Sequence, residues 1–439
     1  MTARLRGPSG LPFVGNLLQF RNDPLAFLRQ TAQYGDIVPI NLLGPTFLLN
    51  HPDYARRVLV DNGDNYTKGP LNRRLKPFLG EGLLTGNGSW WRYQRRLVQP
   101  FFTREKMESL VPRILQVITE VTDSWRRHAA EKRPINIQEE MIRVTSAVIG
   151  EIVLGAPVTR DTQRLSSAVA LGLKIAQRRV GSLFPLPLWI PTAQNIRARH
   201  SLSVLKGIID DHIHDHRQSS QVKPDLLSVL LTCEDEGGQT MSKQQIYDQI
   251  ITVLLAGYET TATAMSWFWY LLAHHTDVQE QAIEEAASAQ TVMATHGGLP
   301  FITACFQETM RLYPPSWLLH RQAVGKDIIG GELINRGIAL LVSPYLLHRD
   351  PRYWDEPENF KPKRFLLGQD LHQKYVYIPF GAGHRYCVGS QLAMLEAQLI
   401  ASSILCRFRL RRVDGSPIRP EAAVTLRPSH PIYLFIETR

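Results

Sequence analysis

The feature that most constrains the fold is a helical pattern without a proline that runs from Ser242 to about His274. The tetrapeptide that begins at Ser242 (SKQQ) fits a capping box, in which a serine and a glutamine three residues later satisfy the first backbone N–H groups of a helix. At 1.5 Å per residue, a helix of thirty-odd residues spans about 45–50 Å, enough to cross a domain. The rest of the chain therefore has to pack around this segment.

The middle of the segment is apolar from Ile250 to Ala273, which leaves a membrane-spanning helix as an alternative. Glu259 and three threonines (Thr260, Thr261 and Thr263) lie at its centre, where a polar side chain that faces lipid costs free energy. We therefore expect a core helix with a functional polar centre.

Two further features favour a cytoplasmic protein without a membrane anchor. Glycines and prolines recur between Met1 and Phe20, so this stretch cannot form the continuous apolar helix of a signal sequence or an anchor. The four cysteines are far apart, and no C-x-x-C pair suggests a disulfide framework or a zinc site. A reducing compartment fits such thiols best.

The order of the patterns predicts one α+β domain over residues 1–439, with helix dominant. Residues 1–65 are expected to be mainly β-rich, with short strands at 36–40 and 46–49 between glycine and proline breakers. Residues 66–312 form the expected helical body. Residues 313–439 are expected to hold β segments, a glycine-rich loop and a last long helix from Ser390 to about Cys406.

Formal net charge is +10, and no basic tail or long run of like charge accompanies it. We therefore expect no nucleic-acid partner. The densest basic stretch holds Arg92, Arg95, Arg96, Arg104 and Lys106. Such a stretch is either a solvated helix face or a landing surface for an acidic protein.

The strongest chemical signal is the ten-residue segment that begins at Phe380, FGAGHRYCVG. Its glycines allow a tight loop that approaches a flat group closely. Cys387 lies just before a helix, whose N-terminal N–H groups and partial positive charge stabilise a thiolate. Arg385 adds a cation suited to a carboxylate. This arrangement suits a metal–thiolate bond, whereas a lone cysteine is more often a buried structural thiol.

The pattern F-x-x-G-x-R-x-C-x-G, from Phe380 to Gly389, resembles the haem-ligand signature of the cytochrome P-450 family at every fixed position. The resemblance implies haem b (iron protoporphyrin IX) held through the Cys387 thiolate. It also implies a monooxygenase that inserts one oxygen atom from O2 into its substrate.

Two further arginines are expected at the haem propionates. Trp91 and Arg95 have i, i+4 spacing on one helix face, and in similar proteins such a pair grips a propionate through the indole N–H and the guanidinium. Arg321 resembles a further propionate contact by its position after a Pro-Pro stop.

The centre of the long helix, Ala256, Gly257, Glu259 and Thr260, resembles the oxygen-side motif of the family. The resemblance implies that Thr260 donates a hydrogen bond to bound dioxygen and that Glu259 delivers protons through water. A glycine inside a helix costs about 1 kcal/mol against alanine. We therefore expect Gly257 to have a purpose, such as opening the helical hydrogen bonding beside the haem.

Glu308 and Arg311 form an E-x-x-R pair, and the resemblance links them with Arg364 in a buried structural triad. The same spacing occurs in Glu140 and Arg143, which lack the Pro-Pro and P-x-R-F context and are expected to be an ordinary helix pair.

By the same resemblance, the substrate pocket draws on Val253, Leu254, Trp317, Leu318 and Val424 and on the segments 69–82 and 180–190. These positions are mostly apolar, so we expect a medium-sized apolar substrate. A terpenoid or a fatty acid is favoured, and a macrolide or a steroid is possible.

The chain ends soon after its last strand, so we expect electrons from a separate ferredoxin or flavodoxin with its NAD(P)H reductase. Two alternatives remain open at this point. One is an enzyme of the same fold that uses or isomerises a peroxide, and the other is a haem-binding sensor without catalysis.

Overall fold

The computed structural model describes residues 5–42, 44–155, 160–182, 186–219, 223–234, 238, 240–289, 298–367, 374–413, 415 and 417–439. The fold is α+β with helix dominant, as predicted. Two compact units are distinguished: one comprises Met1–Leu71, Ala304–Cys387 and Arg419–Ser429, and the other comprises Asn72–Thr303, Val388–Ile418 and His430–Arg439.

The first unit contains most of the β structure. Its strands are β1 (Ile37–Asn41), β2 (Pro45–Leu49), β3 (Tyr66–Thr67), β5 (Leu319–Ala323), β6 (Asp327–Ile329), β7 (Glu332–Ile334), β8 (Ala339–Val342), β10 (Pro420–Ala422) and β11 (Leu426–Pro428). Its helical elements are α1 (Leu17–Asn22), α2 (Pro24–Ala32), α3 (Pro52–Arg56), η1 (Arg57–Asp61), η2 (Gly63–Asn65), α17 (Pro344–Leu347), η4 (Pro362–Phe365) and η5 (Gly383–Arg385). Helix α4 (Pro70–Arg73) and helix α16 (Pro300–Leu312) each connect the two units along the chain.

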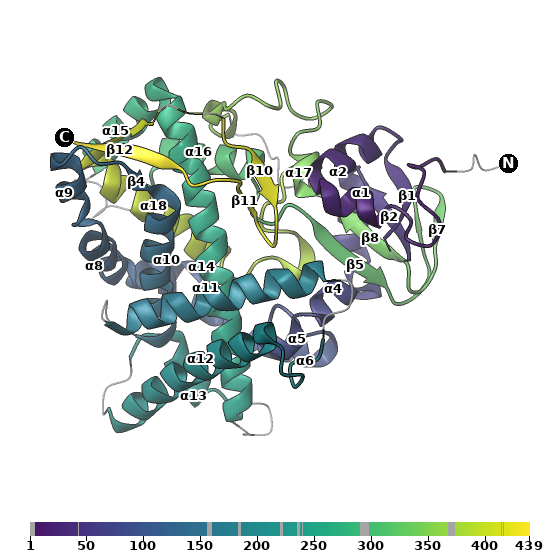
Figure 1. Cartoon of the computed structure of the whole chain (residues 1–439), viewed down its shortest axis with the longest axis horizontal. Helices are drawn as coiled ribbons and strands as arrows, with labels where there is room; N and C mark the ends of the chain where they lie inside the picture. The colour runs from purple at the N-terminus through teal and green to yellow at the C-terminus, as the bar shows by residue number, and fades with distance from the viewer. Residues whose placement is uncertain are drawn as a thin grey trace. The chain divides into compact units, whose positions relative to one another are not determined.

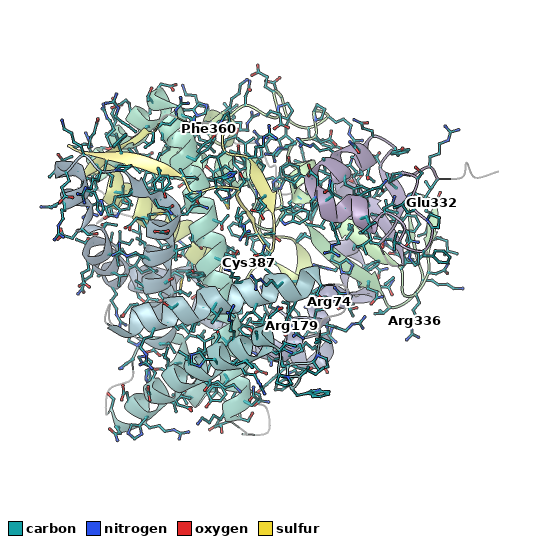
Figure 2. The ribbon with its side chains drawn as sticks, in the orientation of Figure 1. Arg74, Arg179, Glu332, Arg336, Phe360 and Cys387 are labelled. Carbon is teal, nitrogen blue, oxygen red and sulfur yellow. The ribbon has the colours of Figure 1, made fainter. Side chains whose placement is uncertain are left out.

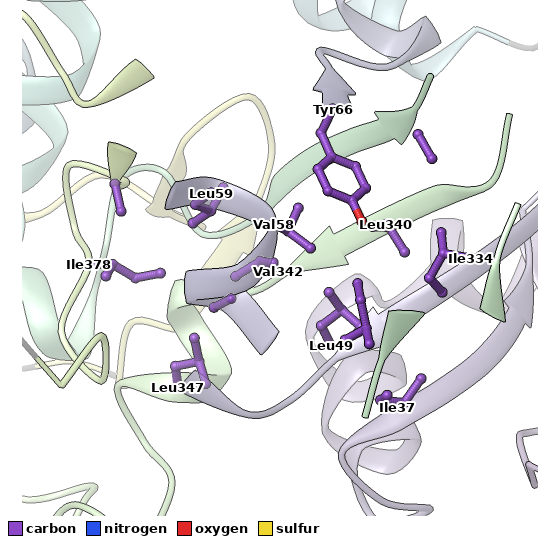
Figure 3. Close-up of a cluster of buried hydrophobic side chains, with 14 residues drawn as sticks. Ile37, Leu49, Val58, Leu59, Tyr66, Ile334, Leu340, Val342, Leu347 and Ile378 are labelled. Atoms are coloured by element: carbon purple, nitrogen blue, oxygen red, sulfur yellow. The ribbon is translucent and has the colours of Figure 1, made fainter. Parts of the chain in front are cut away.

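A five-stranded sheet in the order β1-β2-β8-β5-β3 organises this unit. The β2–β8 pair is parallel and joins Thr46 to Ala339, while the other neighbours are antiparallel. One face of the sheet packs into an apolar cluster that includes Leu49, Val342 and Ile378 (Figure 3). This cluster ties the sheet to the segment that leads into the Cys387 loop.

The second unit is mainly helical. Its helices are α5 (Lys76–Leu79), α6 (Gly88–Val98), η3 (Gln99–Phe102), α7 (Arg104–Ser109), α8 (Val111–Thr122), α9 (Trp125–Ala130), α10 (Ile137–Leu154), α11 (Arg160–Gly181), α12 (Ala193–Gln218), α13 (Leu226–Thr232), α14 (Lys243–His274), α15 (Thr276–Ala289) and α18 (Ser390–Leu405). Strands β4 (Ile135–Asn136), β9 (Phe408–Arg412) and β12 (Tyr433–Thr438) form a small sheet in the order β4-β12-β9.

Helix α14, with 32 residues, runs through this unit and packs along α10 (Figure 1). Both halves of the predicted capping box are present: Ser242 Oγ accepts from the Gln245 N–H, and Gln245 Oε1 accepts from the Ser242 N–H at 2.6 Å. Thr145 of α10 donates to the Tyr258 carbonyl at 3.2 Å, a buried polar tie between the two helices. No helix in the described part of the chain is long and apolar enough to cross a membrane.

Most of the predicted elements are confirmed. Strands β1 and β2, and helices α14 and α18, lie where the patterns place them. The prediction that residues 1–65 are mainly β-rich is wrong, because α1, α2 and α3 occupy much of this region. Helix α2 has an ordinary start signal that the glycine and proline count obscures: Pro24 is its first residue, and the Asp23 side chain accepts from the Ala26 N–H at 3.0 Å.

Candidate active site

The loop before Cys387 is held in one shape by its backbone. Gly381 and Gly383 have φ of +73° and +71°, a region that favours glycine, and a Cβ on Gly383 would overlap the Leu59 carbonyl oxygen. The Cys387 N–H donates to the Phe380 carbonyl at 3.0 Å and closes the loop. Cys387 itself is exposed (Figure 2), although free cysteines are usually among the most buried residues.

Gly389, two residues after this thiol, is a glycine that the packing of the described residues does not explain. Its φ of −88° suits any residue, and among the described residues nothing lies within 4 Å of the position that its Cβ would occupy. The protein's own packing therefore does not require a glycine there. Close approach of a bound group would require one, which fits a haem beside Cys387.

Two arginines of the first unit supply positive charge. Arg321 is a buried residue of β5 and donates from Nη1 to the His320 carbonyl at 3.0 Å. Burial, together with the positive charge of Arg385, lowers the pKa of Arg321 to about 10. Two neighbouring guanidinium groups in a partly dry environment favour an anionic ligand. The carboxylates of a haem match this requirement.

The polar centre of α14 is open, although most of the helix on either side of it is buried. Ala256 is exposed, and Gly257, Glu259 and Thr260 are half-buried, whereas the preceding turn and Tyr258 are buried. The Thr260 hydroxyl donates its proton to the Ala256 carbonyl at 2.7 Å. The lone pairs of the hydroxyl oxygen can still accept a hydrogen bond from another group. An open turn in a core helix fits a flat group lying against it.

Gly257 serves a different purpose from the one expected. Helix α14 continues as α-helix through this position, so the glycine does not open the helical hydrogen bonding. A Cβ on residue 257 would instead lie 2.8 Å from Cδ1 of Ile149 on α10. The glycine lets α10 and α14 approach closely.

Trp91 and Arg95 lie together on α6, as their spacing predicts. The Arg95 guanidinium lies 5.9 Å from the centre of the Trp91 ring, and its Nε donates to Gln99 Oε1 at 3.1 Å. The indole N–H of Trp91 donates to the Leu83 carbonyl at 2.9 Å. In this structure the indole donor is thus engaged by the backbone, and the ring supports Arg95 by cation–π contact.

Glu308, Arg311 and Arg364 form a buried ionic cluster in the first unit. Arg311 donates from Nε and Nη2 to the two Glu308 oxygens at 2.7 and 2.9 Å, and Arg364 Nε reaches Glu308 Oε1 at 3.1 Å. Both Glu308 and Arg311 are 0% exposed. The pair Glu140–Arg143 is a 2.8 Å helix contact whose arginine is about half exposed.

The sequence reasoning missed His348, which the cluster surrounds. Its carbonyl accepts from Arg311 Nη1 at 2.8 Å, and its Nε2 accepts from the Ile378 N–H at 2.8 Å. Burial, with the charges of Arg311 and Arg349, holds the pKa of His348 well below the usual value. A neutral histidine here joins the ion cluster to the irregular segment before the Cys387 loop. A lone histidine outside any motif carries no sequence signal for such a role.

The expected pocket residues lie in both units. Val253 and Leu254 are buried in α14. Trp317 is buried and donates to the Ala423 carbonyl at 3.0 Å, which brings the segment of Leu318 next to that of Val424. Leu318 is half-buried and Val424 is exposed.

The segment after α11 is anchored by residues that the sequence did not single out. Arg74 donates to the Ser182 carbonyl at 2.6 Å, and Arg179 donates to the Leu186 carbonyl at 3.0 Å (Figure 2). The Asn195 amide donates to the Pro187 and Ile190 carbonyls at 2.8 and 3.0 Å. Residues 183–185 of the expected pocket segment lie outside the described residues.

The basic segment continues from α6 to α7. Arg92, Arg96 and Arg104 are exposed. Arg104 pairs with Glu108 at 2.7 Å, and the Lys106 ammonium lies 5.8 Å from the Phe101 ring centre. The segment therefore presents a mostly positive surface.

Comparison with known proteins gives a consistent answer. The family model described as Cytochrome P-450 matches residues 5–435. Cyclooctatin synthase of Streptomyces melanosporofaciens is 33% identical over 434 residues, which covers 95% of this chain and 92% of that protein. Cyclooctat-9-en-7-ol 5-monooxygenase of the same organism is 30% identical, with 94% and 90% covered. Pentalenene oxygenase of Streptomyces avermitilis is 28% identical, with 95% and 94% covered.

Proposed function

Because this chain belongs to the cytochrome P-450 family and is a haem-dependent monooxygenase, we propose that it oxidises a terpenoid. Three of its relatives have names that refer to cyclooctatin, cyclooctat-9-en-7-ol and pentalenene. The apolar side chains at the expected pocket positions suit the same class of substrate and also favour it over a macrolide. The observation that carries the proposal is the exposed Cys387 thiol in a glycine-shaped loop of the unit that also holds the Arg321–Arg385 pair.

The cofactor proposed is haem b. Cys387 would bind its iron, and Arg321, Arg385 and Arg95 would bind its propionates. Bound haem supplies the oxidant, made from O2 with two electrons from a redox partner. Phe380, Ala256, Gly257 and Gly389 would border the porphyrin. Ala256 is exposed, Gly257 is half-buried in the same turn, and no described atom lies within 4 Å of the position of a Cβ on Gly389.

Thr260 and Glu259 are the proposed catalytic residues. With its proton donated to the Ala256 carbonyl, the Thr260 Oγ1 can accept a hydrogen bond from a water molecule and hold it at the open turn. The Glu259 carboxyl would pass protons to that water. A positioned proton donor of this kind contributes about 10²–10⁴-fold in rate.

The remaining proposals concern the redox partners and the cellular compartment. A ferredoxin or a flavodoxin with its NAD(P)H reductase is the proposed electron source, and the basic segment from Arg92 to Lys106 is its proposed docking surface. The four free thiols fit a reducing cytoplasm.

The test is spectroscopic and then catalytic. The reduced, CO-bound difference spectrum of the purified protein is expected to show the red-shifted Soret band of a thiolate-ligated haem. Titration with pentalenene is expected to shift the absorption spectrum of the resting protein, and turnover with a ferredoxin system is expected to give a hydroxylated product. A CO complex with the spectrum of a histidine-ligated haem would overturn the proposal.

A further inference from the structure

Helix α14 carries a group of buried polar atoms that the proposed function does not use. Gln249 is 0% exposed, and within the described part of the chain neither its amide nitrogen nor its amide oxygen has a hydrogen-bond partner. Thr252, which is 3% exposed, also has a buried hydroxyl without a partner. At i, i+3 spacing the two side chains are neighbours on the helix surface. Together they present one donor amide and two acceptor oxygens, one of which can also donate.

Such a group is exceptional, because most buried polar atoms in native proteins are paired. The same unit shows how this chain treats a buried glutamine with a structural role. Gln279 is 2% exposed, its Nε2 donates to the carbonyls of Leu272 and Leu410 at 3.2 and 2.9 Å, and its Oε1 accepts from the Leu410 N–H at 2.9 Å. Leaving a buried amide unpaired costs free energy, so a ligand that satisfies Gln249 recovers it on binding.

Thr252 departs from the same pattern. Several buried hydroxyls in helices of this protein donate to the carbonyl four residues earlier: Thr122 at 2.7 Å, Ser266 at 2.6 Å and Thr309 at 2.8 Å. The hydroxyl of Thr252 does not, and it faces Gly82. A Cβ at residue 82 would overlap that hydroxyl, so only a glycine leaves room beside it.

The position of the pair on α14 connects it with the catalytic residues. Gln249 precedes Ala256 by seven residues and Thr260 by eleven, and both separations return to the same helix face, with Val253 between them. At 1.5 Å per residue, Gln249 lies about 10 Å from the open turn along the helix axis. The pair is therefore placed to contact the far end of a molecule whose near end lies at Thr260.

We propose that Gln249 and Thr252 recognise an oxygen atom that the terpenoid substrate already carries, at a site remote from the carbon to be oxidised. A glutamine amide can donate to and accept from one hydroxyl group at once, so an alcohol fits better than a carbonyl. This inference rests on the proposed function. The reaction that supplies the substrate must then leave oxygen on a hydrocarbon skeleton, as a cyclisation ended by water or an earlier hydroxylation does.

The test compares matched ligands by spectral titration of the holoenzyme. The probes are two pairs that share a terpene skeleton: cedrane with cedrol, and abietadiene with abietadienol. In the unchanged protein at least one alcohol is expected to bind about tenfold or more tightly than its hydrocarbon, because the hydrocarbon leaves the amide unpaired. Gln249→Met, which keeps the length of the side chain, is expected to abolish or reverse this preference. The hydrocarbon should bind the variant more tightly.

Controls separate recognition from packing. Thr252→Val should reduce the preference for the alcohol, whereas Thr31→Val removes a buried, unpartnered hydroxyl of α2 and should leave the preference intact. If neither alcohol is preferred, or if Gln249→Met weakens alcohol and hydrocarbon equally, the inference is wrong. The proposed function is judged separately by the CO difference spectrum, which Gln249→Met should not alter.

Discussion

At the scale of single residues, the proposed ligand cysteine differs from the other three in its exposure. Cys387 is exposed, Cys305 is buried, and Cys233 and Cys406 are partly buried. Burial raises the pKa of Cys233, which disfavours a thiolate there. Only the thiol in the glycine-shaped loop combines access with a neighbouring helix N-terminus.

Replacing Cys387 by alanine is therefore expected to abolish the thiolate signature of the CO complex and all hydroxylation. Absorption spectroscopy of the reduced protein with CO is the measurement. Cys233→Ser is the matched control, because it removes a half-buried thiol elsewhere and should retain both properties. Unchanged absorbance and hydroxylation in Cys387→Ala would contradict the ligand assignment.

The Thr260 hydroxyl offers the second residue-scale prediction. Thr260→Ala removes the group that would hold a proton-carrying water at the open turn. We expect product formation to fall about 100-fold, the lower end for a positioned proton donor, while NAD(P)H is still consumed and peroxide accumulates. Thr261 is a buried neighbour on another face of α14, so in Thr261→Ala the formation of product should remain coupled to the consumption of NAD(P)H.

The measurement is the ratio of product to NAD(P)H consumed. Full coupling in Thr260→Ala would favour an enzyme that uses peroxide and needs no proton relay.

The identities of the candidate site residues were easier to predict than the directions in which their side chains form hydrogen bonds. The spacing of Trp91 and Arg95 places both on one face of α6, and the structure agrees. The direction of the Trp91 indole depends on the carbonyl of Leu83, eight residues away in an irregular segment. The Thr260 hydroxyl bonds within its own helix for a similar reason: an acceptor four residues back is always near. A sequence motif does not indicate which carbonyl either of these side chains will choose as its acceptor.

At the scale of elements, the contact between α10 and α14 makes a testable claim about Gly257. A methyl group there would lie 2.8 Å from Ile149 Cδ1, so Gly257→Ala is expected to destabilise the protein by about 1–3 kcal/mol through overpacking. Adding Ile149→Val should recover part of this loss. Gly207→Ala in α12 is the control, since no described atom lies within 4 Å of that Cβ, and it should stabilise by up to about 1 kcal/mol.

Urea unfolding of the four members of this double-mutant cycle measures the coupling. Additive effects of the two changes would show that the glycine is not required by the helix contact.

The buried ionic cluster at Glu308 can be compared with the more exposed pair Glu140–Arg143 on α10. Arg364→Ala leaves Glu308 without one of its two cations in a buried site, and it is expected to cost about 3–5 kcal/mol in the free energy of unfolding. Arg143→Ala removes the half-exposed partner of Glu140, an i, i+3 pair on α10 like that of Glu308 and Arg311, and should cost less than about 0.5 kcal/mol. Equal urea midpoints for the two variants would contradict the claim that the buried pair contributes more to stability.

Local signals explain which elements could be predicted. The capping box at Ser242 and the glycine-rich start of α18 act within a few residues, so both helices follow from the sequence. Helix α2 also has a local signal in Asp23-Pro24, but a region rich in proline and glycine is easily taken for strands and turns. Short helices depend more on tertiary packing than on their own pattern.

At the scale of the whole molecule, long-range pairings lie beyond such signals. The parallel register of β2 and β8 joins residues 46–49 to 339–342, and nothing local to either strand specifies the other. The unpaired state of Gln249 is equally a property of the assembled fold. The family could be predicted from the ten residues of the loop around Cys387, whereas the choice of a terpenoid over a fatty acid is a proposal that draws on the names of relatives.

Charge on the whole molecule gives the last prediction. Formal net charge is +10, and the exposed arginines of α6 belong to the surface proposed for an acidic electron carrier. Reversing Arg92 and Arg96 to glutamate is expected to raise the KM for ferredoxin about tenfold or more at low salt, because electrostatic steering is lost. Turnover of substrate supported by peroxide, which needs no partner, should change far less.

Salt dependence distinguishes docking from indirect damage to the haem site. Exposed charges are screened over about 8 Å at physiological ionic strength, so the difference between the variant and the unchanged protein should shrink as salt rises. Arg336→Glu, which reverses an exposed arginine of the first unit (Figure 2), is the control for net charge alone. An equal rise in KM for Arg336→Glu would show that the effect belongs to overall charge and not to the segment from Arg92 to Lys106. A rise in KM that is independent of salt would point to altered haem binding through the neighbouring Trp91 and Arg95 instead.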